Sequence, residues 1–212
     1  MTITYEYYNS LYVNITNRCS NACTFCVRNK HDDVNGVNNL WLDREPTIDE
    51  IKEDFETRNL DDYEEIVFCG FGEPTERFDD MIRISKWLKE KKEDVVIRIN
   101  TNGQANLINN RDVTPEMEGA IDIVSISLNA PNSQKYQEIC LSRYGEASFE
   151  AIQDFAKKAK KYVKTVAFTV VDKTMPDSDI EECRKIAERC GVNFRIRAYI
   201  CLLYTSDAAD EL

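Results

Sequence analysis

Three cysteines stand close together near the start of the chain, Cys19, Cys23 and Cys26, in the spacing CxxxCxxC. A thiolate is a soft, anionic ligand that suits iron–sulfur clusters and zinc. Three thiolates on one loop can bind three irons of a cubane cluster and leave the fourth iron open to a further ligand. An open iron is a site for chemistry, so the spacing points to a catalytic metal centre.

A zinc site is the nearest alternative reading of the same residues. His31, the only histidine, follows the cysteines and would complete a Cys3His tetrahedron. Zinc modules of this kind are small and self-contained, whereas this loop opens a long array of strands and helices, which favours the cluster. His31 is then a solvated residue of the polar loop 29–39, and a lone histidine excludes catalysis by several imidazoles.

The elements that must position these cysteines alternate along the chain. Hydrophobic runs predict strands at 11–16, 65–69, 95–100, 121–128, 163–171 and 193–199. Amphipathic periodicity predicts helices at about 47–59, 77–92, 148–162 and 178–190. Strands interleaved with helices imply parallel βαβ units, so we expect a single barrel-like or doubly wound α/β domain.

Local signals mark where three helices begin. Thr47 with Glu50, and Ser178 with Glu181, match the capping box, in which the first side chain and the later carboxylate satisfy each other's backbone N–H groups. Thr114 precedes a proline, and the pair is typical of a cap residue followed by the first helical turn.

Polar residues share one parity of the predicted strands, with apolar residues on the other. This pattern predicts a sheet with one polar, hydrated face that lines a polar lumen. The alternative is that these residues lie near the strand ends and are simply exposed to solvent. Arg195 and Arg197 would point inward if the parity of the last strand holds, or else pair with acids at the edge. The residues on this parity are Asn14, Thr16, Arg98, Asn100, Ser125, Ser127, Asn129, Thr169, Arg195 and Arg197.

Three further motifs follow predicted strands. The second strand is followed by Cys69-Gly-Phe-Gly72-Glu73-Pro74, in which the glycines permit close backbone approach and the proline stiffens the exit. Asn100-Thr-Asn-Gly103 ends the third strand and Ser125-Ile-Ser-Leu-Asn129 ends the fourth. Each motif alone is an ordinary turn signal, and only the cysteines give them weight.

Together these motifs resemble the radical S-adenosylmethionine (SAM) superfamily, whose cysteine motif carries an aromatic residue, here Phe25, before the third cysteine. The resemblance implies a partial (βα)6 TIM-like barrel over residues 1–200, with Cys19, Cys23 and Cys26 holding a 4Fe–4S cluster. It further implies reductive cleavage of SAM to a 5′-deoxyadenosyl radical, with the electron coming from a flavodoxin or ferredoxin.

By the same resemblance, the SAM contacts follow from the matching motif positions. Asn100 and Ser127 are the first candidates for the SAM carboxylate and ribose, and no catalytic residue is expected beyond the cluster ligands. Cys69, Cys140, Cys183 and Cys190 form no second close-spaced set, so an auxiliary cluster is not expected. The implied cofactor-binding residues are Phe25, Gly70, Gly72, Glu73, Pro74, Asn100, Asn102, Ser127 and Asn129.

The segment 12–28, with 168–172 and 195–199, is similar to the small radical SAM proteins associated with TatD-family nucleases. That likeness implies a functional association with a TatD-like hydrolase and leaves the substrate undefined. Two alternatives stay open: an enzyme like 7-carboxy-7-deazaguanine synthase, and a zinc-stabilised binding module on an α/β scaffold.

Composition limits the remaining functions. A net charge of -11 is the wrong sign for nucleic-acid binding, and no apolar run is long enough for a membrane helix. Eight cysteines without a secretory signal favour metal chemistry over disulfides, and we expect a cytoplasmic protein. The last twelve residues, 201–212, resemble translated sequencing-adapter sequence, so we expect this tail to be foreign and the native C-terminus to be missing.

Overall fold

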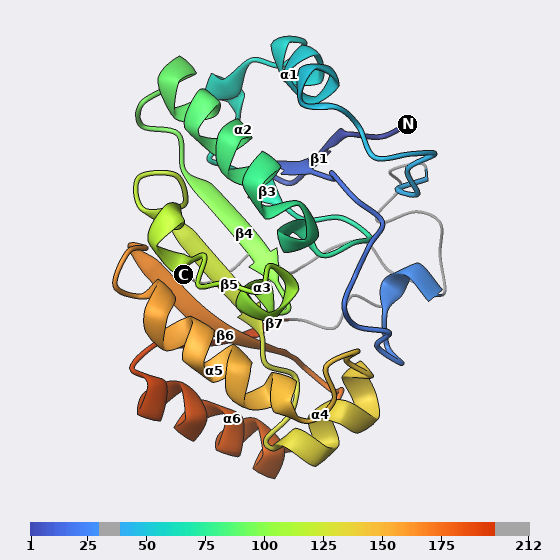
Figure 1. Ribbon diagram of the computed structural model, residues 1–212, viewed down its shortest axis with the longest axis vertical. Coiled ribbons are helices and arrows are strands. Elements are labelled where there is room, and N and C mark those ends of the chain that lie inside the picture. The colour runs from blue at the N-terminus through green and yellow to red at the C-terminus, as the bar shows by residue number, and fades with distance from the viewer. Residues whose placement is uncertain (30–38, 198–212) are drawn as a thin grey trace.

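A computed structural model describes residues 1–29 and 39–197 of the chain. Its centre is one seven-stranded sheet in which the strands follow one another in chain order (Figure 1). β2 to β7 are parallel, and β1 pairs antiparallel with β2. The strands are β1 (Thr4–Tyr7), β2 (Ser10–Val13), β3 (Glu65–Phe68), β4 (Ile97–Thr101), β5 (Ile123–Ser127), β6 (Thr165–Val171) and β7 (Asn193–Arg197).

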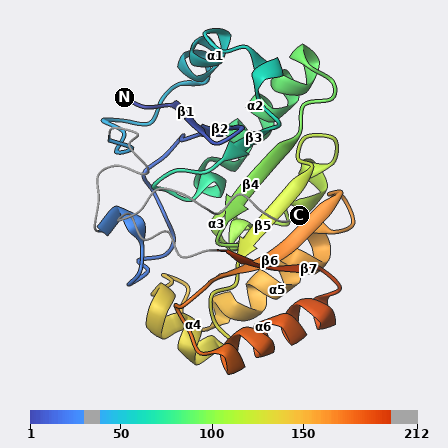
Figure 2. The same ribbon diagram turned by 180° about the vertical axis from the view of Figure 1, so that it is seen from behind.

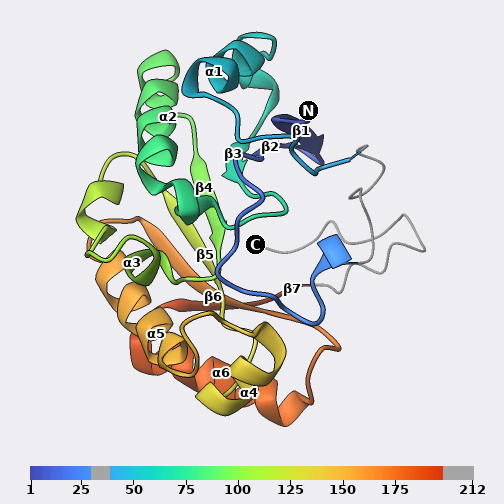
Figure 3. The same ribbon diagram turned by 45° about the vertical axis from the view of Figure 1, so that its right-hand side comes forward.

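The helices gather on one side of this curved sheet (Figures 1 and 3). The predicted α/β class is confirmed, and the sheet is an open, partial barrel because β1 and β7 remain its two edges. The α-helices are α1 (Ile48–Glu56), α2 (Phe78–Lys91), α3 (Ala105–Ile108), α4 (Ser133–Cys140), α5 (Ala147–Ala159) and α6 (Asp177–Cys190). The 3-10 helices are η1 (Val27–Asn29), η2 (Leu60–Asp62), η3 (Pro74–Arg77) and η4 (Thr114–Met117).

All six predicted strands and all four predicted helices are present, with ends shifted by a few residues. β1, α3 and α4 are absent from the prediction, because four to eight residues are too few for a clear periodicity. His31, Tyr199 and the tail 201–212 lie outside the described residues.

Two of the three predicted helix starts need correction. The capping box of α1 is confirmed, since Glu50 N–H donates to Thr47 Oγ1 at 3.2 Å and Thr47 N–H donates to Glu50 Oε2 at 2.8 Å. The box at Ser178 is wrong: α6 begins one residue earlier, follows Pro176, and has no side-chain cap. Thr114 is itself the first residue of η4, and its hydroxyl donates to Asp112 Oδ1 at 2.8 Å.

The two faces of the sheet differ in chemistry. Apolar residues of β2 to β6, such as Leu11, Ile99 and Ile126, are fully buried in the core beneath the helices. On the other face, which we call the inner face, the register pairs Asn100 with Ser125. It likewise pairs Ser127 with Thr169 and Thr169 with Arg195, so the predicted polar face is confirmed across β4 to β7.

Near β1 and β2 the inner face is covered by aromatic side chains. Trp41 packs edge-on against Phe71 at 5.1 Å between ring centroids, and Tyr5 packs against Tyr12 at 5.3 Å. With Leu40, these side chains form a second hydrophobic cluster beside the main core. The Leu40 carbonyl accepts a 2.7 Å hydrogen bond from Asn14 Nδ2. The polar part of the inner face is therefore confined to the side formed by β4 to β7.

Within the two described ranges, no helix is both long and apolar enough to cross a membrane.

Candidate active site

The cysteine loop, residues 19–26, leaves the carboxyl end of β2 and lies against α4 and the residues after it (Figure 2). Ala22 N–H donates to Cys140 O at 3.1 Å, and Thr24 N–H donates to Ile139 O at 2.9 Å. On the return side, Arg143 N–H donates to Ser20 O at 2.9 Å. Two backbone bonds to α4 and one to Arg143 just after it thus fix the loop to a segment more than a hundred residues away in the sequence.

A buried polar network supports the loop from below. The Tyr136 hydroxyl accepts from Asn21 Nδ2 and from Gln104 Nε2, both at 3.0 Å. Gln104 also donates to Asn21 Oδ1 at 2.8 Å and accepts from Ser142 Oγ at 3.0 Å. All four side chains are buried, where an unmade hydrogen bond is costly, so the network specifies one position for the loop. Sequence reasoning missed these residues, although Gln104 directly follows the Asn100–Gly103 motif.

The glycines of the second motif allow it to lie against the start of the cysteine loop. A Cβ on Gly72 would be 2.2 Å from Thr16 O and 2.6 Å from Arg18 O, so only glycine fits there. A Cβ on Gly70 would be 2.1 Å from Asn14 Oδ1. The next residue completes the contact, because Glu73 N–H donates to Arg18 O at 2.7 Å.

The Glu73 carboxylate joins two motifs. Its Oε1 accepts from Thr75 N–H at 3.1 Å and from the hydroxyls of Thr75 and Thr101, both at 2.7 Å. Its Oε2 accepts from Asn102 N–H at 2.7 Å. Burial raises the Glu73 pKa, while the bonds from Asn102, Thr101 and Thr75 lower it. The carboxylate therefore positions the loop after β4.

Asn102 carries the connection to the cysteines. Its Nδ2 donates to Ser20 Oγ at 2.8 Å and lies 4.0 Å from Cys19 Sγ. Its Oδ1 accepts from Gln104 N–H at 2.9 Å, which closes an Asx turn. Glu73, Asn102 and Ser20 form one chain of hydrogen bonds, so the structure brings three of the predicted motifs together at this edge.

The other predicted contacts lie around the same edge. Asn100 and Ser127 are half-buried on the inner face, and the Asn100 side chain hydrogen-bonds to the Cys69 thiol. Asn129 is buried in a left-handed conformation at φ 57°, with its Nδ2 3.9 Å from Cys140 Sγ. Phe25 packs against the main core, and Pro74 is the buried first residue of η3.

Burial and nearby groups act in opposite directions on the ionisation of the thiols. Cys19 receives a hydrogen bond from Asn21 N–H, and Cys26 receives one from Arg28 N–H. Burial raises the pKa of Cys19 to about 12 and raises that of Cys26, while the positive charge of Arg28 lowers both. Cys23 is close enough for its charge to act on both.

In this structure Cys23 contacts Cys140 and does not form a metal site with Cys19 and Cys26. Its thiol is hydrogen-bonded to Cys140, and this bond, more than burial, raises its pKa. Among residues 1–29 and 39–197, no three Cys, His, Asp or Glu side chains are gathered as a metal-holding set. The donor chemistry fits a cluster, and Cys23 would have to turn from Cys140 to share a metal with Cys19 and Cys26.

Arg28 is a further residue that sequence reasoning missed. Its guanidinium donates to the carbonyls of Asn17 at 3.4 Å, Phe71 at 3.3 Å and Asn21 at 3.2 Å. These bonds join both ends of the cysteine loop to the glycine motif. Its place two residues after Cys26 is the only signal in the sequence.

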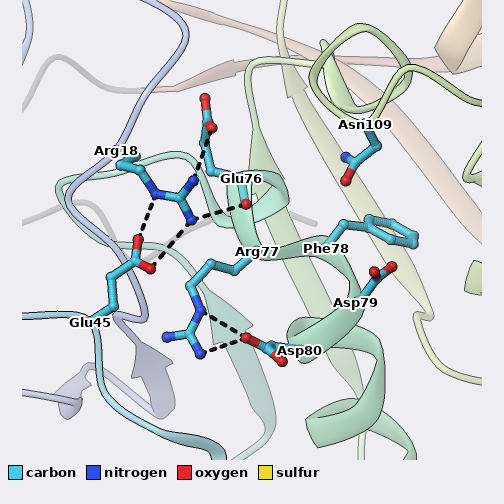
Figure 4. A pocket seen from close by; sticks show the side chains of 8 residues that line it. All are labelled: Arg18, Glu45, Glu76, Arg77, Phe78, Asp79, Asp80 and Asn109. Atoms are coloured by element: carbon cyan, nitrogen blue, oxygen red, sulfur yellow. Dashed lines mark hydrogen bonds and ion pairs between the residues drawn. The ribbon is translucent and has the colours of Figure 1, made fainter.

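On the outer side of the loop is a shallow pocket of about 330 Å³ lined mostly by charged residues (Figure 4). Arg18 points at Glu45, with Nε 2.6 Å from Oε1, and lies 3.8 Å from Glu76. Arg77 donates to Asp80 at 2.6 Å and to Ile15 O at 2.9 Å. Arg18 and Arg77 each form an ion pair, so we interpret the charged side chains of this pocket as structural contacts that fix the residues leading to Cys19.

Comparison with known proteins agrees with this geometry. The family model "Radical SAM superfamily" matches residues 13–187. Among solved structures, TYW1 with a lysine–pyruvate adduct has a TM-score of 0.64 at 15% identity, over 93% of this chain and 67% of that one. Streptococcus suis SuiB bound to S-adenosylmethionine has a TM-score of 0.64 at 18% identity, over 95% of this chain and 41% of that one.

A radical SAM methyltransferase from Sphaerobacter thermophilus has a TM-score of 0.60 at 19% identity, over 92% of this chain and 57% of that one. The chain thus spans about half of the length of some of these structures, and likeness at this identity shows the fold. No curated protein matches the chain in sequence. Because the family model covers most of the residues, this chain belongs to the radical SAM superfamily.

Proposed function

We propose that the chain holds a 4Fe–4S cluster on Cys19, Cys23 and Cys26 and uses it to cleave SAM reductively. When bound there, the cluster would supply the electron for reductive cleavage of SAM and so for hydrogen-atom abstraction from a substrate, and the three cysteines would be its ligands. The observation that carries the proposal is the hydrogen-bond chain from Glu73 through Asn102 to Ser20. It fixes the glycine motif and the Asn100–Gly103 motif beside the cysteine loop.

The chain's own residues would divide the work of binding. Backbone groups at 70–74 would face the SAM amino group, because the Glu73 side chain is already occupied by Thr75, Thr101 and Asn102. Asn100 and Ser127, half-buried on the inner face, would approach the carboxylate and ribose, and Asn100 would exchange its contact with Cys69 for one with SAM. Arg28 would hold the loop closed and place a positive charge beside the thiolates.

The proposal extends to partners. Reduction of the cluster needs an external donor of the flavodoxin or ferredoxin type. The similarity of 12–28, 168–172 and 195–199 to the TatD-associated proteins supports a functional association with a TatD-family hydrolase.

SAM turnover tests the proposal. Anaerobically prepared protein with dithionite and SAM should release 5′-deoxyadenosine, and Cys23→Ala should reduce the rate to the background without enzyme, since one iron loses its ligand. Cys183→Ala is the matched control, because Cys183 is a buried free thiol on α6 and no part of the cysteine loop. Continued SAM cleavage by Cys23→Ala, or equal loss in both variants, would refute the ligand assignment.

A further inference from the structure

Three arginines occupy the inner face of the sheet: Arg98 on β4, and Arg195 and Arg197 on β7. The register places Arg195 beside Thr169 and Arg197 beside Val171. Since side chains alternate between the faces of a strand, Arg195 and Arg197 point to the same side. The inward orientation left open by the sequence is therefore confirmed.

Arg98 is nearly buried, with 12% of its side chain exposed, and pairs with Glu65 at 2.6 Å. Glu65 supplies a single carboxylate, which also accepts a hydrogen bond from Ser10 Oγ at 3.2 Å. The Nε of Arg98 is buried and has no hydrogen-bond partner. One of its donors is thus left without an acceptor.

Arg197 is less well compensated. Its Nε is also buried without a hydrogen-bond partner, and no carboxylate in the described part of the chain forms an ion pair with it. Burial lowers the pKa of Arg197, and the charges of Arg195 and Arg98 act in the same direction, opposed by Cys69 and Tyr12. The guanidinium of Arg197 therefore lies in the electric field of the two other arginines.

A buried guanidinium N–H without an acceptor is unfavourable, because it loses water and gains no hydrogen bond in return. Such a cost persists in sites where a ligand supplies the missing partner. The planar fork of arginine matches the two oxygens of a carboxylate or a phosphate. In the outer pocket, by contrast, Arg18 and Arg77 each pair with a carboxylate.

We propose that Arg98 and Arg197 bind an anionic group, a carboxylate or phosphate, of the substrate on the inner face, with Arg195 at its exposed rim. The assignment rests on the proposed radical SAM function for the idea that the inner face is the substrate site. Arg98 precedes Asn100 by two residues on β4, so its Cα lies about 7 Å along the strand from the expected SAM carboxylate contact. The substrate class is thus an organic acid or a phosphate ester.

Calorimetric titration of the anaerobically prepared full chain tests the site, with inorganic phosphate and succinate as probes at constant ionic strength. We expect saturable binding of at least one probe to the wild-type protein, weakened tenfold or more by Arg197→Gln. Arg197→Lys keeps the charge without the fork and should bind several-fold more weakly than wild type. Arg184→Gln, on α6 with its guanidinium over the Phe194 ring and therefore on the opposite side of β7 from Arg197, is the control for loss of a positive charge and should bind like wild type.

Several results would overturn the anion site: no binding of either probe, unchanged binding in Arg197→Gln and Arg197→Lys, or equal weakening in Arg184→Gln. Phosphate binding alone assigns a phosphate ester, and succinate binding alone assigns a carboxylate. A rise in KM for SAM in Arg197→Gln, matching its loss of probe binding, would assign the arginine to SAM and refute the substrate role. Absence of SAM cleavage in wild type would refute the proposed function, while the titration would still report on the anion site.

Discussion

Gly72 illustrates how single residues define this site. The chain after β3 crosses the residues that lead to Cys19 so closely that an added methyl group would meet two carbonyl oxygens. The sequence predicts a backbone approach at the Gly-Glu-Pro motif, and the structure confirms it. The sequence does not show which backbone is approached, because this depends on strands that are more than fifty residues apart.

Gly72→Ala should lower the free energy of unfolding by about 1–3 kcal/mol, since the crowded backbone must move. The same displacement should reduce iron bound per chain, because Arg18 directly precedes the cysteine loop. Urea unfolding and iron analysis measure the two effects. Gly119→Ala is the control: its Cβ would meet nothing within 4 Å, so it adds only backbone strain at φ +69°. Full iron loading of Gly72→Ala would contradict the account.

Glu73 shows a different limit of sequence reasoning at this scale. The motif marks Glu73 as a candidate SAM contact, yet its oxygens already accept four hydrogen bonds from the protein. A motif identifies a position, whereas the role of the side chain depends on neighbours from other strands, here Thr101 and Asn102. The same reason hides Asn21 and Gln104, which carry no motif of their own.

At the scale of elements, the cysteine loop depends on α4. This helix has eight residues and only two of them, Tyr136 and Cys140, are buried, so its sequence pattern is too weak to predict. Its position is set by tertiary contacts: the Tyr136 hydroxyl with Asn21 and Gln104, and the carbonyls of Ile139 and Cys140 with the loop. Removing one contact should therefore act on the cysteines.

Tyr136→Phe leaves the amides of Asn21 and Gln104 without their shared acceptor and should cost about 1–3 kcal/mol. We expect iron loading to fall as well, because Asn21 lies between Cys19 and Cys23. Denaturant unfolding and iron analysis test both effects. Tyr8→Phe, at a side chain that is 68% exposed, should leave both unchanged. Normal iron loading in Tyr136→Phe would show that α4 does not hold the loop.

The start of α1 makes a prediction about pH. The pKa of Glu50 is lowered from 4.5 to about 2. The hydrogen bond with the Arg44 guanidinium is the largest cause, and the hydrogen bond from Thr47 N–H is the second. The unfolded chain therefore takes up this proton first as the pH falls. The stabilisation by Glu50 is present in full above its unfolded pKa and is lost progressively towards the folded value.

Glu50→Gln should destabilise the protein at pH 7, and the difference from wild type should shrink between pH 5 and pH 2. Denaturant unfolding at a series of pH values measures this difference. Glu53→Gln, at an exposed position of the same helix, controls for the loss of one negative charge. A difference that stays constant from pH 7 to pH 2.5 would contradict the capping account.

At the scale of the whole molecule, alternating strands and helices are enough to predict a parallel α/β sheet. The alternation of Arg98 and Asn100 with buried isoleucines also predicts its polar inner face, which the register confirms. The open edge at β7 and the antiparallel β1 do not follow from the sequence pattern, because strand order is a property of the assembled sheet. The poor compensation of the Arg197 charge is likewise visible only in the assembled sheet, where β4 with Arg98 and β7 with Arg197 share one face.

The cysteine ligands are the central claim for the molecule, and metal analysis tests them most directly. The protein, prepared without oxygen, should be brown and contain about four iron and four sulfide per chain with little zinc. Cys19→Ala, Cys23→Ala and Cys26→Ala should each lose most of the iron. A colourless protein with about one zinc per chain would contradict the account and support the Cys3His alternative.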